Sequence, residues 1–165
     1  MKTARAQHVA VPKALLDSEA FTDSHYMSAY ELLTPNAGSA TPEQWGRAAF
    51  EGAPAPVRGF LVLGWTQVLR LRMGPKPSSE HVLGWEMSGP LPGTDHDFDS
   101  LVLQARSGLV TAHNVVVVKG ASVLWATAVQ FRKPAGRLVW GLAQPVHQLA
   151  MPRLLRRASR SIAVG

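Results

Sequence analysis

The feature that most constrains the fold is a change in hydrophobic periodicity at Gly74-Pro75-Lys76-Pro77. Before this break, apolar residues recur at helical spacing, in one helix that begins at Thr41-Pro42-Glu43-Gln44 and a second over roughly residues 56–73. The first helix start has a threonine N-cap, a proline at the first position and a glutamine that can bond back to the cap. Beyond the break the pattern becomes strand-like, so helices and strands are segregated along the chain.

Five segments have the alternation of strands. One precedes the helices and four follow the break: 24–33, 81–87, 100–106, 109–118 and 121–132. Tight turns at Ser107-Gly108 and Lys119-Gly120 predict antiparallel neighbours.

The last segment, about 134–162, indicates a helix interrupted by Pro145 and Pro152, either one kinked helix or two consecutive helices. Four arginines share one side of its end, opposite a stripe of apolar residues. They are Arg153, Arg156, Arg157 and Arg160, opposite Leu154, Leu155, Ala158 and Ile162.

Length and composition predict one folded domain. The chain has 165 residues, of which 46% are hydrophobic and 17% charged, enough to bury one core. Residues 1–20 lack sustained periodicity, so we expect a loose arm there and a single domain over 21–165. The predicted fold is α+β, with a curved antiparallel sheet covering the apolar stripe of the C-terminal helix and two shorter helices between the first and second strands.

Three segments resemble a known group of proteins: TPEQWGRAAFEGAPAPVRGF, VVVVKGASVLWATAVQFRKPAGRLVWGL and AQPVHQLAMPRLLRRAS. Over about residues 24–160 the chain is similar to an uncharacterised bacterial family, domain of unknown function 2867, within the START and Bet v 1-like (SRPBCC) superfamily. The resemblance implies a helix-grip fold around an elongated apolar cavity, which superfamily members use for lipids, sterols, hormones, aromatic polyketides or quinones. It transfers no catalytic residue.

Several function classes are excluded. The chain has no cysteine, which removes disulfides, thiolate zinc sites and cysteine nucleophiles. It also lacks a glycine-rich phosphate loop, a nucleophile elbow and a zinc-protease motif. The run Asp95-His96-Asp97-Phe98-Asp99 does not match a calcium loop, because Ser100 and Arg106 replace the required glycine and glutamate. We therefore predict no metal or cofactor, and, without a signal segment or membrane span, a cytoplasmic location.

Charge is distributed unevenly. The net charge is +6, yet residues 1–99 hold eight basic and all eleven acidic residues, whereas 100–165 hold nine basic residues and no acid. The arginines Arg153, Arg156, Arg157 and Arg160 suit either an anionic membrane surface or plain solvation. Nucleic acid is not expected as a partner, since no reader motif or interleaved aromatic residues accompany them.

Candidate ligand contacts come from the strands and the last helix. Apart from Thr111, the polar residues of strand 109–118 are His113 and Asn114, and we expect one of these two to face the interior. His113 is a candidate ligand or acid–base group, or else a hydrogen-bonded core histidine. In strand 121–132, Trp125 and Thr127 share an apolar wall that is either core or cavity lining.

Five further side chains are candidates. Trp85 is expected to face inward, which leaves Glu86 either solvated or, if buried, a general acid or base with a raised pKa. His147 is placed on the inner side of the last helix, as a ligand contact or a partner at the Pro145 kink. Tyr26 and Tyr30 share one face of the first strand and either orient a ligand or are buried for structure.

Three functions follow from these features. The first is binding of a hydrophobic small molecule, lipid, aromatic or polyketide-like, in a cavity between sheet and helix. The second is a cyclase, dehydratase or isomerase using His113 or His147, with Glu86 as a weaker candidate. The third is a module that docks on anionic membranes. Ligand identity and oligomeric state are not predicted.

Overall fold

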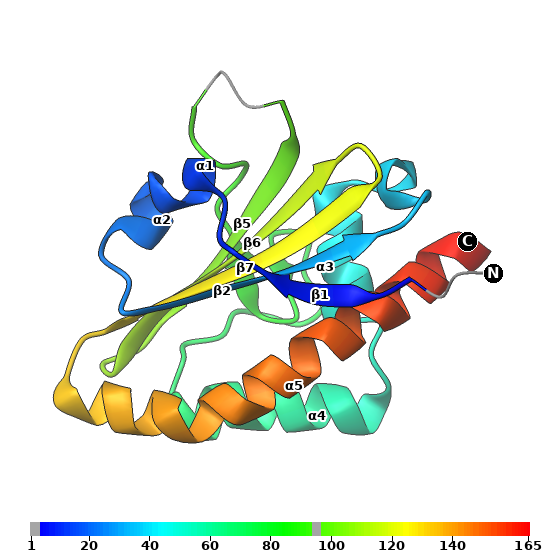
Figure 1. Ribbon diagram of the computed structural model, residues 1–165. Coiled ribbons are helices and arrows are strands. Elements are labelled where there is room, and N and C mark those ends of the chain that lie inside the picture. The colour runs from blue at the N-terminus through cyan, green and yellow to red at the C-terminus, as the bar shows by residue number, and fades with distance from the viewer. Residues whose placement is uncertain (1–3, 94–96) are drawn as a thin grey trace.

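In a computed structural model, which describes residues 4–93 and 97–165, the chain forms an α+β fold whose curved, open sheet clasps a long C-terminal helix (Figure 1). The elements are β1 (Ala6–Val9), α1 (Lys13–Leu16), α2 (Glu19–Thr22), β2 (Tyr26–Leu33), η1 (Ala37–Ser39), α3 (Pro42–Phe50), α4 (Ala55–Leu63), the π-helical turn η2 (Gly64–Val68), β3 (His81–Val82), β4 (Trp85–Met87), β5 (Asp99–Arg106), β6 (Val110–Lys119), β7 (Ser122–Phe131) and α5 (Pro134–Val164). The seven described strands pair antiparallel in the order β1-β2-β7-β6-β5-β4-β3. The predicted α+β helix-grip fold class is confirmed.

Alternation along the strands gives the sheet two different faces. The inner face turns toward α3, α4 and α5 and carries the larger side chains, including Trp85, Trp125 and Val129. The outer face is covered by α1 and α2 and carries smaller ones, such as Ala126 and Val115. Each face therefore belongs to its own hydrophobic cluster, and only the inner face contacts the long helix.

The local signals read from the sequence are mostly confirmed. Thr41 and Gln44 form the capping box of α3, with reciprocal backbone–side-chain bonds of 3.1 and 2.8 Å. The strands predicted over 24–33, 100–106, 109–118 and 121–132 are β2, β5, β6 and β7, shifted by at most two residues. The segment 81–87 is instead a hairpin of two short strands, because Leu83 and Gly84 adopt the positive φ values of a tight turn, 45° and 91°.

The N-terminal residues differ from the loose arm predicted for 1–20, over the part from residue 4 onward that the structure describes. β1 pairs with β2, and α1 and α2 pack on the outer face through Leu15 and Phe21, each 1% exposed. Elements of four residues are too short to show a period. Their order comes from tertiary contacts, which single-sequence patterns do not reveal.

The second predicted helix, 56–73, is shorter than expected. α4 ends at Leu63 and passes into η2, where Leu69 donates its N–H to the carbonyl of Gly64, five residues back, at 3.0 Å. Arg70 then takes a φ of 58°, which ends helical structure. No residue of α4 is fully buried.

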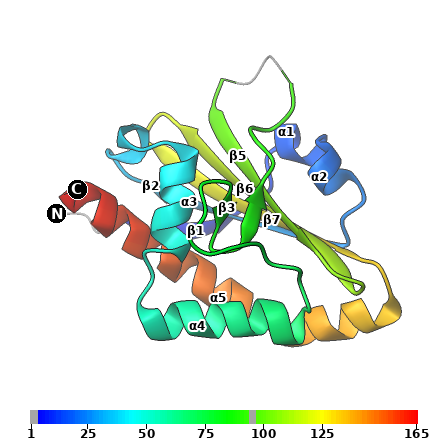
Figure 2. The ribbon, with the colours of Figure 1, turned by 180° about the vertical axis from the view of Figure 1, so that it is seen from behind.

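α5 is a single helix of 31 residues that includes both Pro145 and Pro152. It changes direction along its length, rising from the lower edge of the sheet toward the C-terminus (Figure 1). Figures 1 and 2 both show α4 below the sheet and under the middle of α5, and η2, which continues α4, contacts α5. No helix among the described residues is long and apolar enough to cross a membrane.

Candidate functional site

An apolar pocket of about 330 Å³ lies between the inner face of the sheet, α4 with η2, and the first half of α5. Phe60 and Trp65 form the wall on the α4 side, and Trp140 and Val146 form the wall on the α5 side. The sheet supplies a floor, which holds the polar side chains of Asn114 and Thr127. An apolar hollow with few polar groups is typical of small-molecule sites.

The polar floor is built by Asn114 of β6 and Thr127 of β7, which are direct neighbours in the sheet. Asn114 Oδ1 accepts hydrogen bonds from the Trp125 indole at 3.0 Å and from the Thr127 hydroxyl at 2.7 Å. The indole N–H can only donate, so it fixes which end of the amide is oxygen. Asn114 Nδ2 donates to no described residue and is not fully enclosed, which leaves its N–H groups for the pocket.

His147 projects from α5 into the pocket wall, as predicted from the sequence. Its Nε2 atom is enclosed and has no hydrogen-bond partner within the described residues. Burial lowers the pKa of His147 from the ordinary value near 6.5 to about 4. The imidazole is therefore neutral at physiological pH, and the pocket contains a polar but uncharged group.

Two tryptophans complete the aromatic lining. Trp85 of β4 packs edge-on against Trp65, with ring centroids 5.5 Å apart, and Trp140 of α5 packs against Tyr26 at 5.0 Å. The indole nitrogens of Trp85 and Trp140 are also enclosed and lack a described partner. Since these atoms have almost no accessible surface, a ligand would pair with them only if the pocket walls moved.

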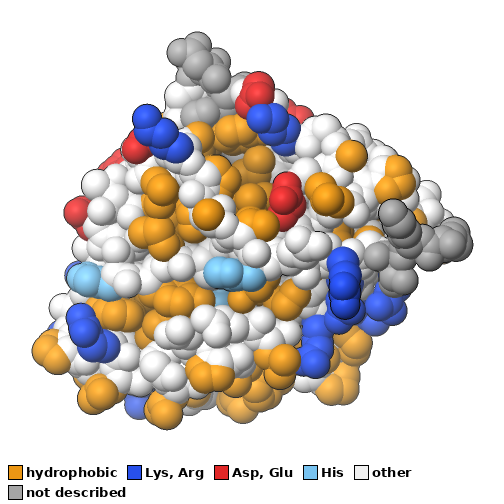
Figure 3. Space-filling view, in the orientation of Figure 1, with side chains coloured by type: hydrophobic (Ala, Val, Ile, Leu, Met, Phe, Trp, Pro, Cys, Tyr) orange, Lys and Arg blue, Asp and Glu red, His pale blue; other side chains and the backbone are white. Residues whose placement is uncertain are grey.

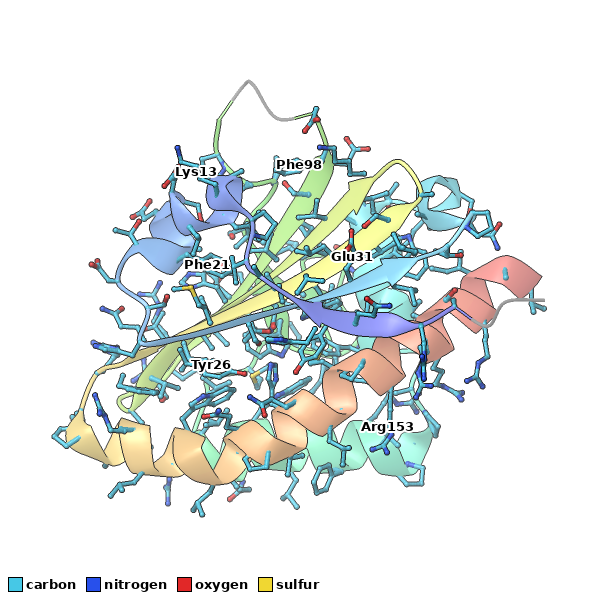
Figure 4. The ribbon with its side chains drawn as sticks, in the orientation of Figure 1. Lys13, Phe21, Tyr26, Glu31, Phe98 and Arg153 are labelled. Atoms are coloured by element: carbon cyan, nitrogen blue, oxygen red, sulfur yellow. The ribbon has the colours of Figure 1, made fainter. Side chains whose placement is uncertain are left out.

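Three predicted ligand contacts support the pocket without lining it. Trp125 is the diagonal neighbour of Asn114 in the sheet and packs edge-on against Phe50, with ring centroids 4.9 Å apart. Tyr26 points from β2 toward α5 (Figure 4). The hydroxyls of Tyr26 and Tyr30 both form long hydrogen bonds of 3.4 Å with Gln148 of α5. Burial and, less strongly, the neighbouring Tyr26 raise the pKa of Tyr30. The tyrosines therefore join the sheet to the helix.

His113 does not line the apolar pocket, because alternation places it on the outer face of β6 while Asn114 points inward. It lies in a separate polar cleft of about 620 Å³ with Arg106, Glu19 and Asp23. Burial and then the charge of Arg106 lower its pKa, and Glu19 opposes the shift. Glu86 is exposed to solvent on β4, facing away from Trp85, which points inward as predicted. The structure thus separates His113 and Glu86 from His147.

The predicted arginine stripe lies on the second half of α5. Arg153, Arg157 and Arg160 are exposed and Arg156 is half-buried. Arg157 donates to the carbonyl of Gly52 at 3.4 Å, and Figure 4 shows Arg153 at the surface. Leu154 and Leu155, on the opposite side, are buried as expected.

The acidic run 95–99 falls partly outside the described residues, which exclude Asp95 and His96. Asp97 forms an ion pair with Lys119 at 2.8 Å, and Asp99 begins β5. Within 4–93 and 97–165, no group of three or more histidine, aspartate or glutamate side chains is arranged to hold a metal ion.

Sequence reasoning missed Asn114 as a ligand group and Trp140 as a wall residue. Parity along β6 did not single out Asn114, because His113 alternates with Val115 and Val117 just as Asn114 alternates with Val116 and Val118; the pairing with Thr127 appears only in the sheet. Comparisons of the chain with protein-family models, with curated proteins and with solved structures found no match.

Proposed function

We propose that the protein binds a compact apolar small molecule that carries a hydrogen-bond acceptor, in the pocket between sheet, α4 and α5. One observation carries the proposal: the unpaired N–H groups of Asn114 form the polar floor of a pocket whose walls are aromatic and aliphatic. Burial of the ligand's apolar surface supplies affinity, and the amide orients its oxygen.

The size and charge of the pocket narrow the ligand class. A volume of about 330 Å³ is near the lower end for small-molecule sites. This favours an aromatic or polyketide-like compound over a long-chain lipid. His147 is neutral and the lining contains no Asp, Glu, Lys or Arg, so a charged ligand would lose its hydration without compensation. The resemblance to the helix-grip superfamily implies a wider range of ligands, which includes aromatic polyketides as well as lipids.

The first experiment identifies a retained compound. Native mass spectrometry of freshly purified protein, followed by organic extraction, should show an added mass that the extract explains. Ala112→Leu places a larger side chain on the pocket floor, so this variant should lose the compound. Retention of the same compound by Ala112→Leu would contradict the proposed site.

The second experiment tests whether a hydrogen-bond acceptor on the ligand strengthens binding. We expect the protein to bind 2-acetylnaphthalene more tightly than 2-isopropylnaphthalene, which has the same shape without the carbonyl, by about threefold to tenfold. Asn114→Leu with Thr127→Val removes both the amide donors and the hydroxyl bonded to the amide without adding a carboxyl group, so the preference should disappear. His113→Gln, on the outer face, is the matched control and should preserve it. Equal affinity of the wild-type protein for both naphthalenes would refute the role of Asn114.

A further inference from the structure

The helices α4 and α5, which enclose the pocket, also carry many of the exposed apolar side chains of the described residues. We define the α4–α5 apolar surface as Phe60 and Leu63 of α4 with Leu138, Leu142, Val146 and Leu149 of α5. Leu138 and Leu142 are 74% and 76% exposed. Figure 3 shows hydrophobic side chains gathered along the lower edge of the molecule, where Figure 1 places these two helices. A contiguous exposed apolar surface of this kind marks an interaction site.

The pocket opens through this surface. Phe60, Leu63, Leu142 and Val146 line the pocket and are also exposed to solvent. Leu138 and Leu149 belong to the surface but do not line the pocket. A partner that covers the α4–α5 apolar surface therefore also covers the pocket mouth. Substitutions at Leu138 and Leu149 change this surface without changing the pocket lining, so docking and ligand binding can be tested separately.

The helical segments that carry this surface have charges of one sign. The segments α4, η2 and α5 contain six arginines and no acidic residue. At about 100° per residue, Leu138, Leu142 and Leu149 share one side of α5 with Arg153, Arg156 and Arg160. The outer side of this helix therefore passes from leucines to arginines along its length.

The combination of exposed leucines and arginines on α5 favours one kind of partner for the α4–α5 apolar surface. In a symmetric dimer formed through this side of α5, each copy would bring arginines and no carboxylate, so like charges would oppose association. A bilayer with anionic lipids instead offers an apolar interior for the leucines and negative headgroups for the arginines.

We propose that the α4–α5 apolar surface docks on a bilayer containing anionic lipid, with the arginines of α5 on the headgroups. The pocket mouth then faces the acyl region. An apolar ligand can pass between bilayer and pocket without crossing water. This last step rests on the proposed function, whereas docking itself does not.

The test is flotation with vesicles of phosphatidylcholine alone and of phosphatidylcholine mixed with phosphatidylserine. Wild-type protein should partition preferentially to the mixed vesicles, and added salt should weaken binding. Leu138→Ser with Leu149→Ser should lower partitioning at least about tenfold. Arg153→Gln with Arg160→Gln should lower it about thirtyfold on mixed vesicles, since each basic residue near such a surface contributes about fivefold.

A matched control makes the same chemical change elsewhere. Leu16 and Leu33 are 40% and 62% exposed on α1 and β2, outside the α4–α5 apolar surface. Leu16→Ser with Leu33→Ser should float like the wild type. Circular dichroism and binding of 2-acetylnaphthalene in solution should be unchanged in the Leu138→Ser, Leu149→Ser protein, which separates failure of docking from failure of the pocket.

Three results would overturn the proposal. The first is equal wild-type binding, or no binding, to both kinds of vesicle. The second is normal flotation of the Leu138→Ser, Leu149→Ser protein. The third is a wild-type dimer in solution that this double variant converts to a monomer, which would assign the surface to a second copy of the chain.

Discussion

The same strands form both faces of the sheet, but the inner face borders a pocket whereas the outer face is closely packed. On the inner face, the large rings of Trp85 and Trp125 lie between the strands and the helices together with Phe50 of α3, and a pocket remains beside them. On the outer face, Ala126 and Ala128 let α1 and α2 approach closely and pack on the sheet. Large side chains thus accompany the apolar hollow, and small ones the close packing.

The histidines show the same contrast in electrostatic terms. His147 on the inner side has a pKa lowered to about 4 by burial. His113 on the outer side has a lowered pKa through burial and Arg106, while Glu19 acts in the other direction. The inner pocket excludes charge, whereas the outer cleft contains charges of both signs. An acid–base role that couples the two histidines is incompatible with the sheet between them.

The largest expected difference between the faces is in stability. Trp125→Ala should lower the free energy of unfolding by about 4 kcal/mol, because the side chain is fully buried and its loss enlarges a cavity. His113→Ala on the outer face should cost less than about 1 kcal/mol. Urea unfolding at neutral pH measures both, and equal losses would remove the contrast.

Enlarging one alanine on each face compares the closely packed outer face with the pocket on the inner face. Ala126→Leu should lower the free energy of unfolding by up to about 3 kcal/mol, because Ala126 is fully enclosed between its neighbours on the outer face. Ala112→Leu should cost less than about 1 kcal/mol, since its side chain extends into the pocket, and should abolish binding of 2-acetylnaphthalene. Thermal unfolding and fluorescence titration distinguish the two outcomes; a severely destabilised Ala112→Leu protein would mean that the pocket does not accommodate a ligand.

The lowered pKa of His147 predicts a pH dependence. The unfolded state takes up a proton near pH 6.5 and the folded state only near 4, so stability is complete above the unfolded value and falls with falling pH. Between pH 7 and pH 5 the free energy of unfolding should drop by about 2 kcal/mol from this group. His147→Gln should flatten the profile of urea midpoints over this range more than His113→Gln does. An unchanged profile in His147→Gln would place His147 in water.

The smallest effect is expected in α4. Gly59 is exposed within the helix, and an added Cβ would meet no atom within 4 Å. Gly59→Ala should therefore stabilise α4 by about 0.5–1 kcal/mol and raise the hydrogen-exchange protection of this helix, without changing that of the outer face. A loss of stability would show that Gly59 has a packing role.

The sequence predicted the fold class, the capped α3 and the inward parity of Trp85, Trp125 and Thr127, because periods of two and 3.6 are local properties. It did not reveal β1, α1 and α2, whose order depends on distant contacts of Leu15 and Phe21. It named both His113 and Asn114 as the polar residues of β6 but could not choose between them, since the pairing with Trp125 and Thr127 exists only in the sheet. The cytoplasmic location of the protein stays a prediction, which cell fractionation would test.

The order of the strands has a consequence for solubility at high concentration. The described sheet ends on one side in the four residues of β1 and on the other in the two residues of β3. Unpaired backbone at such borders can recruit a strand from another molecule, and short borders offer few bonds for this. The eight- and ten-residue strands, which would be the efficient templates for aggregation, are kept in the middle.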